Sequence, residues 1–393
     1  MRRLLWRGRK VGLLVGMLLG VLGFPMLARA QQPEMPLPRD PLAGRVLFVQ
    51  KNCQGCHAIA GAGGRVGPDL GARPFLGTFL QFAGLMWNHA PQMSAKMREL
   101  QVLRPQFTQS EMLDLIAYIY ALPYQDIPGS PREGERLFSA KHCLRCHAIA
   151  GKGGRVGPDL QSLRWVSPVH IAATMWNHGR AMQERMRALK VPRPTFSGHE
   201  IVDLVSYLRA GGRTEARSGL YEIRGDAAAG ERLFASKACG RCHAVRGQGG
   251  RVGPDLARPE FRLSVTELAG AMWNHGPKMW DKMQELGIAR PHLTGQEMAD
   301  VAAYLYFTKF RDEPGSPAAG ERAFRSKRCA ECHDRNEMTR TARFMNPVQI
   351  AQTLWNHAPK IEEAQQARRV RWATFRGNEV ADLVAYLRSV YPY

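Results

Sequence analysis

Two cysteines three positions apart, followed at once by a histidine, occur four times in this chain of 393 residues. The copies read CQGCH (53–57), CLRCH (143–147), CGRCH (239–243) and CAECH (329–333). Together they use all eight cysteines, so none is left for the disulfides that a cysteine-rich exported chain would normally form. The repeated chemistry is therefore a pair of thiols beside an imidazole.

This spacing is that of covalent c-type haem attachment. On one helical turn both thiols reach the two vinyl groups of a haem and form thioethers, and the next residue points its imidazole at the iron. A zinc site would need two cysteine pairs brought together, and a redox dithiol needs no adjacent histidine. We therefore predict four haems c. The attachment residues are Cys53, Cys56, Cys143, Cys146, Cys239, Cys242, Cys329 and Cys332, and the proximal iron ligands are His57, His147, His243 and His333.

Each motif lies in a repeat, with intervals of 90, 96 and 90 residues between first cysteines. A Gly-x-x-x-Phe phrase precedes the cysteines, and the repeat ends in an amphipathic run such as EMLDLIAYIY (111–120), whose apolar residues recur at helical spacing. Thr108–Glu111, Ser197–Glu200 and Thr294–Glu297 form capping boxes before these helices, whereas Arg376 takes the cap position in the fourth. No segment has strand periodicity, so we expect an all-α protein.

A second periodicity suggests that a two-unit module was duplicated. PGSP occurs at 128–131 and again at 314–317, whereas the middle junction is longer. We expect a string of separate domains. The boundaries are a signal peptide at 1–30, unit 1 at 31–127, unit 2 at 128–213, unit 3 at 214–312 and a divergent unit 4 at 313–393.

The first thirty residues have the parts of a secretory signal peptide. A basic stretch, MRRLLWRGRK, precedes an apolar run of 17 residues, and ARA before Gln31 is a small-x-small cleavage site. The competing interpretation is an uncleaved anchor, but the run is short for a spanning helix and Pro25 interrupts it. We expect a periplasmic or exported protein, attached to a membrane only if this segment is retained.

The chain is strongly basic, with 55 Lys and Arg against 34 Asp and Glu and a formal charge of +21. Removing residues 1–30 takes away six basic residues and no acidic one, which leaves +15. Two propionates on each of four haems would add about −8, so the basic residues partly neutralise the cofactors. Exported proteins rarely meet nucleic acid. We expect other redox proteins or a respiratory complex as partners, bound through a basic face.

At these residues each unit resembles a small class I cytochrome c domain. The shared features are the Gly-x-x-x-Phe helix, Cys-x-x-Cys-His, a GPDL loop, a distal-ligand segment and a final Leu-x-x-Tyr helix, although unit 4 lacks the GGRVGPDL loop. The resemblance implies four tandem domains, each wrapped around one haem, with first and last helices crossing near Gly44, Phe48 and Tyr118. It also implies that a loop-proline carbonyl accepts the proximal Nδ1–H and fixes the ring. These prolines are Pro68, Pro158 and Pro254.

A second phrase, Trp-Asn-His, occurs once per unit, beginning at Trp87, Trp176, Trp273 and Trp355. We expect these tryptophans in the core or at the haem edge, with the neighbouring Asn and His around the same turn. The resemblance implies a methionine as sixth iron ligand, and two methionines four residues apart follow the phrase in units 1–3. The candidates are Met97, Met186 and Met283, then Met93, Met182 and Met279. The alternative ligands are His89, His178, His275 and His357, and both methionine positions could instead only line an apolar pocket.

Unit 4 keeps its attachment motif but has Ile361 and Gln365 at the two methionine positions. His357 could bind the iron of haem 4, the sixth position could stay open, or another residue could supply the ligand. Bis-histidine iron would have a lower potential than Met/His iron. In each case haem 4 differs electronically from the other three.

Two functions fit this pattern. The leading hypothesis is a multihaem carrier of electrons between redox partners in the cell envelope, because no catalytic Ser/His/Asp grouping, carboxylate pair or phosphate loop is visible. The rival is a haem-dependent reductase or peroxidase whose reaction centre is an open fourth haem. Membership of a larger respiratory complex would make the same haem predictions.

Overall fold

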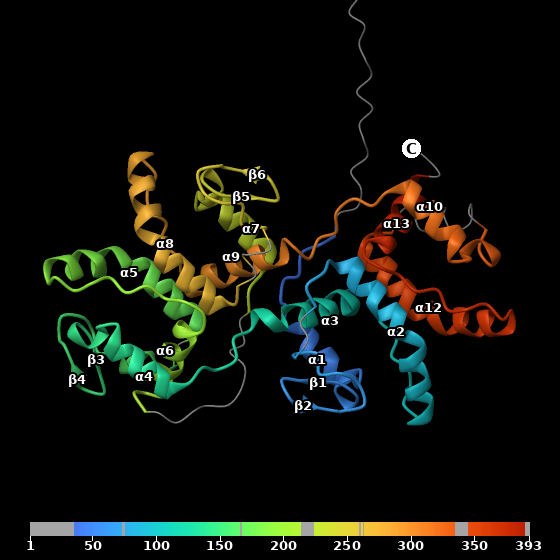
Figure 1. The fold of residues 1–393 in the computed structure, drawn as a ribbon, viewed down its shortest axis with the longest axis horizontal. Coiled ribbons are helices and arrows are strands. Elements are labelled where there is room, and N and C mark those ends of the chain that lie inside the picture. The colour runs from blue at the N-terminus through green and yellow to red at the C-terminus, as the bar shows by residue number, and fades with distance from the viewer. Residues whose placement is uncertain are drawn as a thin grey trace, which may run out of the picture. The chain divides into compact units, whose positions relative to one another are not determined.

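The computed structural model describes residues 35–72, 75–165, 167–213, 224–258, 261, 263–334 and 345–389 (Figure 1). The predicted signal peptide lies outside the described residues. None of the described helices is long and apolar enough to span a membrane. The regular secondary structure of the described chain is helical apart from three short antiparallel strand pairs, which confirms the all-α prediction.

The elements recur in the same order along the chain (Figure 1). The helices of units 1 and 2 are α1 (Ala43–Gln50), α2 (Phe79–Glu99), α3 (Gln109–Ala121), α4 (Pro131–Ala140), α5 (Pro168–Ala188) and α6 (Glu200–Arg209). Those of units 3 and 4 are α7 (Ala227–Ser236), α8 (Val265–Glu285), α9 (Gly295–Phe307), α10 (Pro317–Ser326), α12 (Pro347–Ala367) and α13 (Glu379–Ser389). The 3-10 turns are η1 (Cys53–Gly55), η2 (Leu122–Tyr124), η3 (Cys143–Arg145), η4 (Leu160–Trp165), η5 (Cys239–Arg241) and η7 (Cys329–Glu331). The strand pairs are β1 (Ala58–Ile59) with β2 (Ala62–Gly63), β3 (Ala148–Ile149) with β4 (Lys152–Gly153), and β5 (Ala244–Val245) with β6 (Gln248–Gly249).

In every unit the first helix crosses the last one at a glycine. A Cβ on Gly44 would stand 2.0 Å from the backbone oxygen of Asp114, so no side chain fits at this crossing. One turn later Phe48 packs edge-on against Tyr118, with ring centroids 6.1 Å apart. The predicted crossing is therefore confirmed. Unit 4 has it too, because Gly320 lies against Asp382 and Phe324 against Tyr386.

The predicted capping boxes are present before α3 and α9. Helix α6 begins only at Glu200, whose side chain still accepts the amide of Ser197 at 2.9 Å. Unit 4 differs from the expectation that its box is lost, because Glu379 accepts the amide of Arg376 at 2.7 Å. A backbone donor needs no particular side chain at the cap position, so this half of the box survives.

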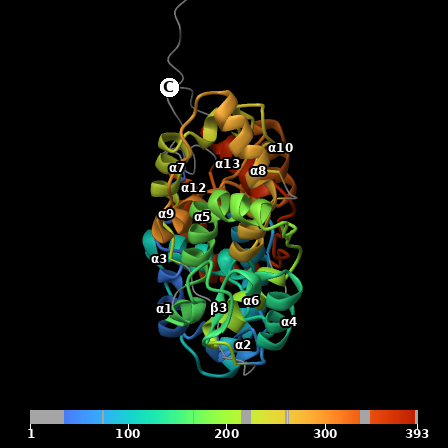
Figure 2. The ribbon, with the colours of Figure 1, turned by 90° about the vertical axis from the view of Figure 1, so that its left-hand side faces the viewer.

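The helices that carry Trp-Asn-His cross one another in pairs, and these pairs are not sequence neighbours. Helix α2 packs on α12 and on α13, while α12 packs on α2 and α3 (Figure 1). Helix α5 packs on α8 and α9, while α8 packs on α5 and α6 (Figure 2). Unit 1 is thus paired with unit 4, and unit 2 with unit 3. The expected string of separate domains is wrong, because each unit covers part of another unit's core.

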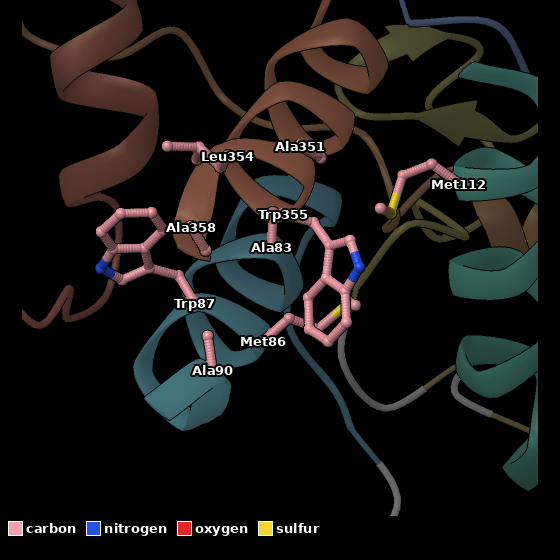
Figure 3. A pocket seen from close by; sticks show the side chains of 9 residues that line it. All are labelled: Ala83, Met86, Trp87, Ala90, Met112, Ala351, Leu354, Trp355 and Ala358. Atoms are coloured by element: carbon pink, nitrogen blue, oxygen red, sulfur yellow. The ribbon is translucent and has the colours of Figure 1, made fainter. Parts of the chain in front are cut away.

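Small residues let the paired helices approach closely. Ala83 and Ala90 of α2 face Ala351 and Ala358 of α12 across a void of only about 10 Å³ (Figure 3). Trp87 and Trp355 point to opposite sides of this crossing. In the other pair the residue three positions after the tryptophan is glycine, at Gly179 and Gly276. A Cβ on either glycine would stand 2.9 Å from the Trp280 ring.

Each tryptophan and its asparagine bind the backbone of the paired unit. Trp87 donates Nε1–H to the Ala373 carbonyl at 2.6 Å, and the Asn88 side chain both donates to the carbonyl and accepts from the amide of Phe375, each at 2.7 Å. The other three copies make the same contacts. Trp176 and Asn177 bind Pro291 and Leu293, Trp273 and Asn274 bind Pro194 and Phe196, and Trp355 and Asn356 bind Pro105 and Phe107.

A proline inside the helix exposes one further acceptor. Because proline has no N–H, Pro277 of α8 leaves the Trp273 carbonyl without its helical donor. Arg193 of unit 2 donates to that oxygen at 2.7 Å, and its guanidinium lies 3.8 Å from the Trp273 ring centroid. Pro359 and Arg104 repeat this arrangement around Trp355. Burial lowers the pKa of both arginines to about 10, which leaves them charged at neutral pH.

Carboxylates also join units 1 and 3. Asp126, which follows α3, accepts the amide of Thr266 at 3.1 Å and its hydroxyl at 2.7 Å in the first turn of α8. Asp312, which follows α9, accepts the Thr78 hydroxyl and the Leu80 amide at the start of α2. Both side chains cap the unpaired amides at a helix amino terminus. Burial raises the pKa of Asp312 to about 6.

The helix crossing predicts a strong effect of one methyl group. Gly230→Ala would place Cβ 1.9 Å from the Asp300 backbone oxygen, so α7 must move away from α9. We expect a loss of about 2–4 kcal/mol in unfolding free energy, at or above the usual cost of overpacking. The measurement is denaturant unfolding followed by circular dichroism. Gly270→Ala is the matched control, because its Cβ meets Ile201 at an ordinary 3.5 Å, and equal stability of the two variants would contradict this account.

The contact between units 2 and 3 predicts that one substitution relieves the destabilisation caused by another. Gly179→Ala should destabilise the protein because the added methyl meets the Trp280 ring. Trp280→Ser, which places at this position the residue that unit 1 has at Ser94, should relieve the clash in the double variant. Double-mutant analysis of unfolding free energies should therefore give a favourable coupling of about 1 kcal/mol or more. Simple additivity would show that the two side chains do not compete for this space.

The raised pKa of Asp312 predicts a pH dependence. An unfolded aspartate ionises near 3.8 and the folded one near 6, so the folded state holds more protons between these values and stability falls as pH rises through them. Asp312→Asn should abolish this fall in unfolding free energy. The fall amounts to at most about 3 kcal/mol, because a shift of one pKa unit corresponds to about 1.4 kcal/mol. The measurement is the difference between wild-type and variant unfolding free energies at pH 4 to 7. A flat difference would refute the prediction, and exposed Asp281 serves as control.

Candidate haem-binding sites

The four cysteine pairs sit on one repeated backbone turn. The residue before the first cysteine is left-handed in every copy, with φ between 57° and 63° at Asn52, His142, Ala238 and Arg328. It ends the preceding helix and starts a 3-10 turn. The amide of the motif histidine then donates to the carbonyl of the first cysteine, at 2.9 Å for His57 and 3.0 Å for His333. Unit 4 therefore keeps the attachment geometry of the other units.

The predicted support of the proximal histidine is present in units 1–3. Nδ1 of His57 lies 3.0 Å from the Pro68 carbonyl, His147 lies 3.0 Å from that of Pro158, and His243 lies 3.1 Å from that of Pro254. This bond leaves Nε2 of each ring as the nitrogen available to a metal. The equivalent loop of unit 4 falls largely at 335–344, outside the described residues.

A glycine before each of these prolines lies flat against the imidazole. A Cβ on Gly67 would stand 2.3 Å from Cε1 of His57, and Gly157 and Gly253 have the same relation to His147 and His243. The GGRVGPDL loop therefore holds the ring by a carbonyl on its edge and by a bare backbone at its side. These two contacts with the imidazole explain why the loop has a glycine followed by a proline.

The environment of the first cysteine of each pair fits a thioether better than a thiolate. Burial raises the pKa of Cys53, Cys143 and Cys239 to about 11, and it also raises the pKa of Cys329. A zinc ligand or a redox nucleophile would need the thiolate, which such burial disfavours. Among the described residues no group of three or more His, Cys, Asp or Glu side chains could hold a metal ion. A neutral sulfur bonded to carbon suits this position.

Unit 2 encloses a cavity of about 510 Å³, within the range of about 300–1,000 Å³ that ligand pockets span. Cys143, Cys146 and His147 line it together with residues of α5. Its remaining walls are mostly apolar, with Phe138 and Leu208 among them. A mostly apolar cavity lined by two thiols and an imidazole fits a covalently bound haem.

The structure brings all the predicted distal candidates of unit 2 to this cavity. Met182, Met186 and His178 line it together with Met175, which the sequence interpretation overlooked. Met175 directly precedes the tryptophan of the phrase, as do Met86 and Met272 in units 1 and 3. His178 Nδ1 lies 3.1 Å from the Thr174 carbonyl of its own helix. The choice between Met182 and Met186, and between their counterparts in units 1 and 3, stays a prediction.

The tryptophans have a role that the sequence did not predict. They are buried as expected, but their N–H groups bind the paired unit rather than groups of their own unit. Trp273 of unit 3 also lines the cavity of unit 2. The receiving segments of units 1–3 begin with Arg-Pro, at 104–105, 193–194 and 290–291, and this recurrence was the available signal.

In unit 4 the two histidines lie close together. The ring centroids of His333 and His357 are 6.5 Å apart, with 47° between the ring planes. Desolvation lowers the pKa of His357, and so do the nearby His333 and Lys360. A neutral imidazole is the form that binds metals. Ile361, at the first of the two methionine positions, packs against the surrounding core.

Comparison with known protein families supports the haem interpretation. The cytochrome c family model matches residues 42–123 and 227–308, and the model described as cytochrome C oxidase, cbb3-type, subunit III matches residues 129–208. No curated protein and no solved structure matches the chain significantly. Domains of the cytochrome c type bind haem covalently and exchange electrons through its iron. Units 1, 2 and 3 are therefore cytochrome c domains, and the chain is a c-type cytochrome of several domains.

Proposed function

We propose that this chain holds four covalent haems c and carries electrons between redox proteins of the cell envelope. The observation that carries the proposal is the attachment turn, which unit 4 shares with the three cytochrome c domains in its left-handed residue, 3-10 turn and histidine amide bond. The helix crossing at Gly320 adds that unit 4 has the same framework. One backbone repeated four times argues for one cofactor repeated four times.

Each group of residues would have its own role in holding the haem. Each cysteine pair fixes the macrocycle, and His57, His147, His243 and His333 hold the iron from one side. The methionine-bearing face of α2, α5 and α8 closes the other side and keeps water out. When bound, haem supplies a reversible one-electron change at iron, whose potential depends on axial ligands and burial. Together these residues would hold a redox group.

The paired units suggest the route of electrons. Trp273 of unit 3 forms part of the wall of the unit 2 cavity, and the reciprocal contact places Trp176 against unit 3. Aromatic and methionine side chains of units 2 and 3 also pack in one hydrophobic cluster. We propose exchange within the 2–3 pair and within the 1–4 pair, and transfer between pairs through the contact of units 1 and 3.

The proposed location is the periplasm or the exterior, reached by the signal peptide at 1–30. The proposed partners are redox proteins or a respiratory complex. The chain without residues 1–30 has a net charge of +15 and would stay positive after about −8 from four haems, which supports an encounter with an acidic surface that salt would weaken. A reductase or peroxidase with an open haem 4 is the rival function, and the closeness of His333 and His357 speaks against it.

The proposed number of four haems predicts the mass of the mature protein. The mature protein, made in a host that attaches haem c, should carry four porphyrins by intact mass and by haem-to-protein absorbance. The Cys329→Ala/Cys332→Ala variant should lose one haem of the four, because thioether bonds cannot form. Cys53→Ala/Cys56→Ala is the matched control and should also lose one. A wild-type protein with three haems, all retained in the Cys329→Ala/Cys332→Ala variant, would refute the tetrahaem proposal.

A further inference from the structure

We infer that His357 is the sixth ligand of haem 4, so that unit 4 holds a bis-histidine iron beside three sites that offer methionine. This inference deepens the proposed function and rests on it, because it requires a haem in unit 4. The observation behind it is the 6.5 Å separation of the His333 and His357 ring centroids.

The separation matches a pair of imidazoles on one metal ion. An imidazole nitrogen binds a first-row metal at about 2.0 Å, and the ring centre lies about 1.1 Å farther out, so two imidazoles on opposite sides of one ion have centroids about 6 Å apart. The observed value is close to this. In the described parts of units 1–3, no such ring contact joins the proximal histidine to the histidine of the Trp-Asn-His phrase.

The hydrogen bonds distinguish His357 from two of its counterparts. Nδ1 of His89 lies 2.8 Å from the Leu85 carbonyl, and Nδ1 of His178 lies 3.1 Å from that of Thr174. His357 has no hydrogen bond to another described residue, so its ring is not committed to its own helix. The side chain is exposed, on the side of α12 that His333 approaches.

Unit 4 has also lost every competing sulfur on this helix face. The three methionines that units 1–3 carry along the helix are replaced by Leu354, Ile361 and Gln365. Met345 is the one methionine among the described residues of unit 4. It lies before the first turn of α12, where its carbonyl accepts a bond from Arg388 of α13, and it is separated from His357 by three turns of helix.

The pairing of units explains how the geometry is held. Two residues before His357, Trp355 is fixed to the Pro105 carbonyl at 2.8 Å, and Asn356 is fixed to Phe107 of unit 1. These contacts fix the rotation of α12 about its axis, and therefore the direction in which His357 leaves the helix. Unit 1 thus acts as the support of a ligand in unit 4.

The test compares axial ligation in the intact protein, after its haem content has been counted. Wild type should show four low-spin ferric haems by electron paramagnetic resonance, one of them with a bis-imidazole signal, and no haem that binds carbon monoxide when reduced. His357→Ala should turn one haem high-spin and carbon monoxide-reactive. His357→Met should keep that haem low-spin and raise its midpoint potential.

His89→Ala is the matched control at the same position of unit 1, and it should leave every haem low-spin. The inference is overturned if wild type already binds carbon monoxide at one haem, or if His357→Ala retains four low-spin, unreactive haems. Far-ultraviolet circular dichroism and His357→Met separate ligand loss from unfolding. A protein whose unit 4 carries no haem would refute the tetrahaem proposal instead, so the two failures are distinguishable.

Discussion

The Trp-Asn-His helices have to satisfy two neighbours at once, and the rest of the structure depends on this constraint. One face of α5 lines the cavity beside the attachment cysteines, with Met182 and Met186 pointing to it. The other face carries Ala172, Trp176 and Gly179, which are buried against unit 3. Because the helix is rigid, a shift at one face moves the other. Haem binding and unit pairing are therefore mechanically coupled.

The proline inside three of these helices illustrates how a local rule is broken for a tertiary reason. Proline in a helix interior costs about 3 kcal/mol, chiefly through a lost backbone bond and a steric clash. Here the carbonyl released by Pro91, Pro277 or Pro359 receives a donor from the paired unit, which is Trp372, Arg193 or Arg104. The local loss thus creates an acceptor on an otherwise saturated helix, and the paired unit supplies the donor.

The features that could be predicted from the sequence are those that depend on residue spacing within one unit. The cysteine turns, the glycine crossings and the proline carbonyls on His57, His147 and His243 could be predicted, because each depends on residues of one unit. The pairing of units could not, because hydrogen bonds such as Trp87 to Ala373 join residues 286 positions apart. The PGSP junctions at 128–131 and 314–317 pointed to a different grouping, of unit 1 with unit 2 and of unit 3 with unit 4. Relatedness by duplication and contact in the fold are separate properties.

One residue after the repeated phrase does record the pairing. Copies 1 and 4 read WNHA, and copies 2 and 3 read WNHG. The copies that share a residue at this position are those whose helices pack together, α2 with α12 and α5 with α8. The arrangement is nested, since the inner contact from Trp176 spans 115 positions and the outer one from Trp87 spans 286. Closing the shorter loop costs less chain entropy, so the inner pair can form first. Synthesis runs from the amino terminus, and the first unit must therefore keep an apolar helix face uncovered until the last unit has emerged.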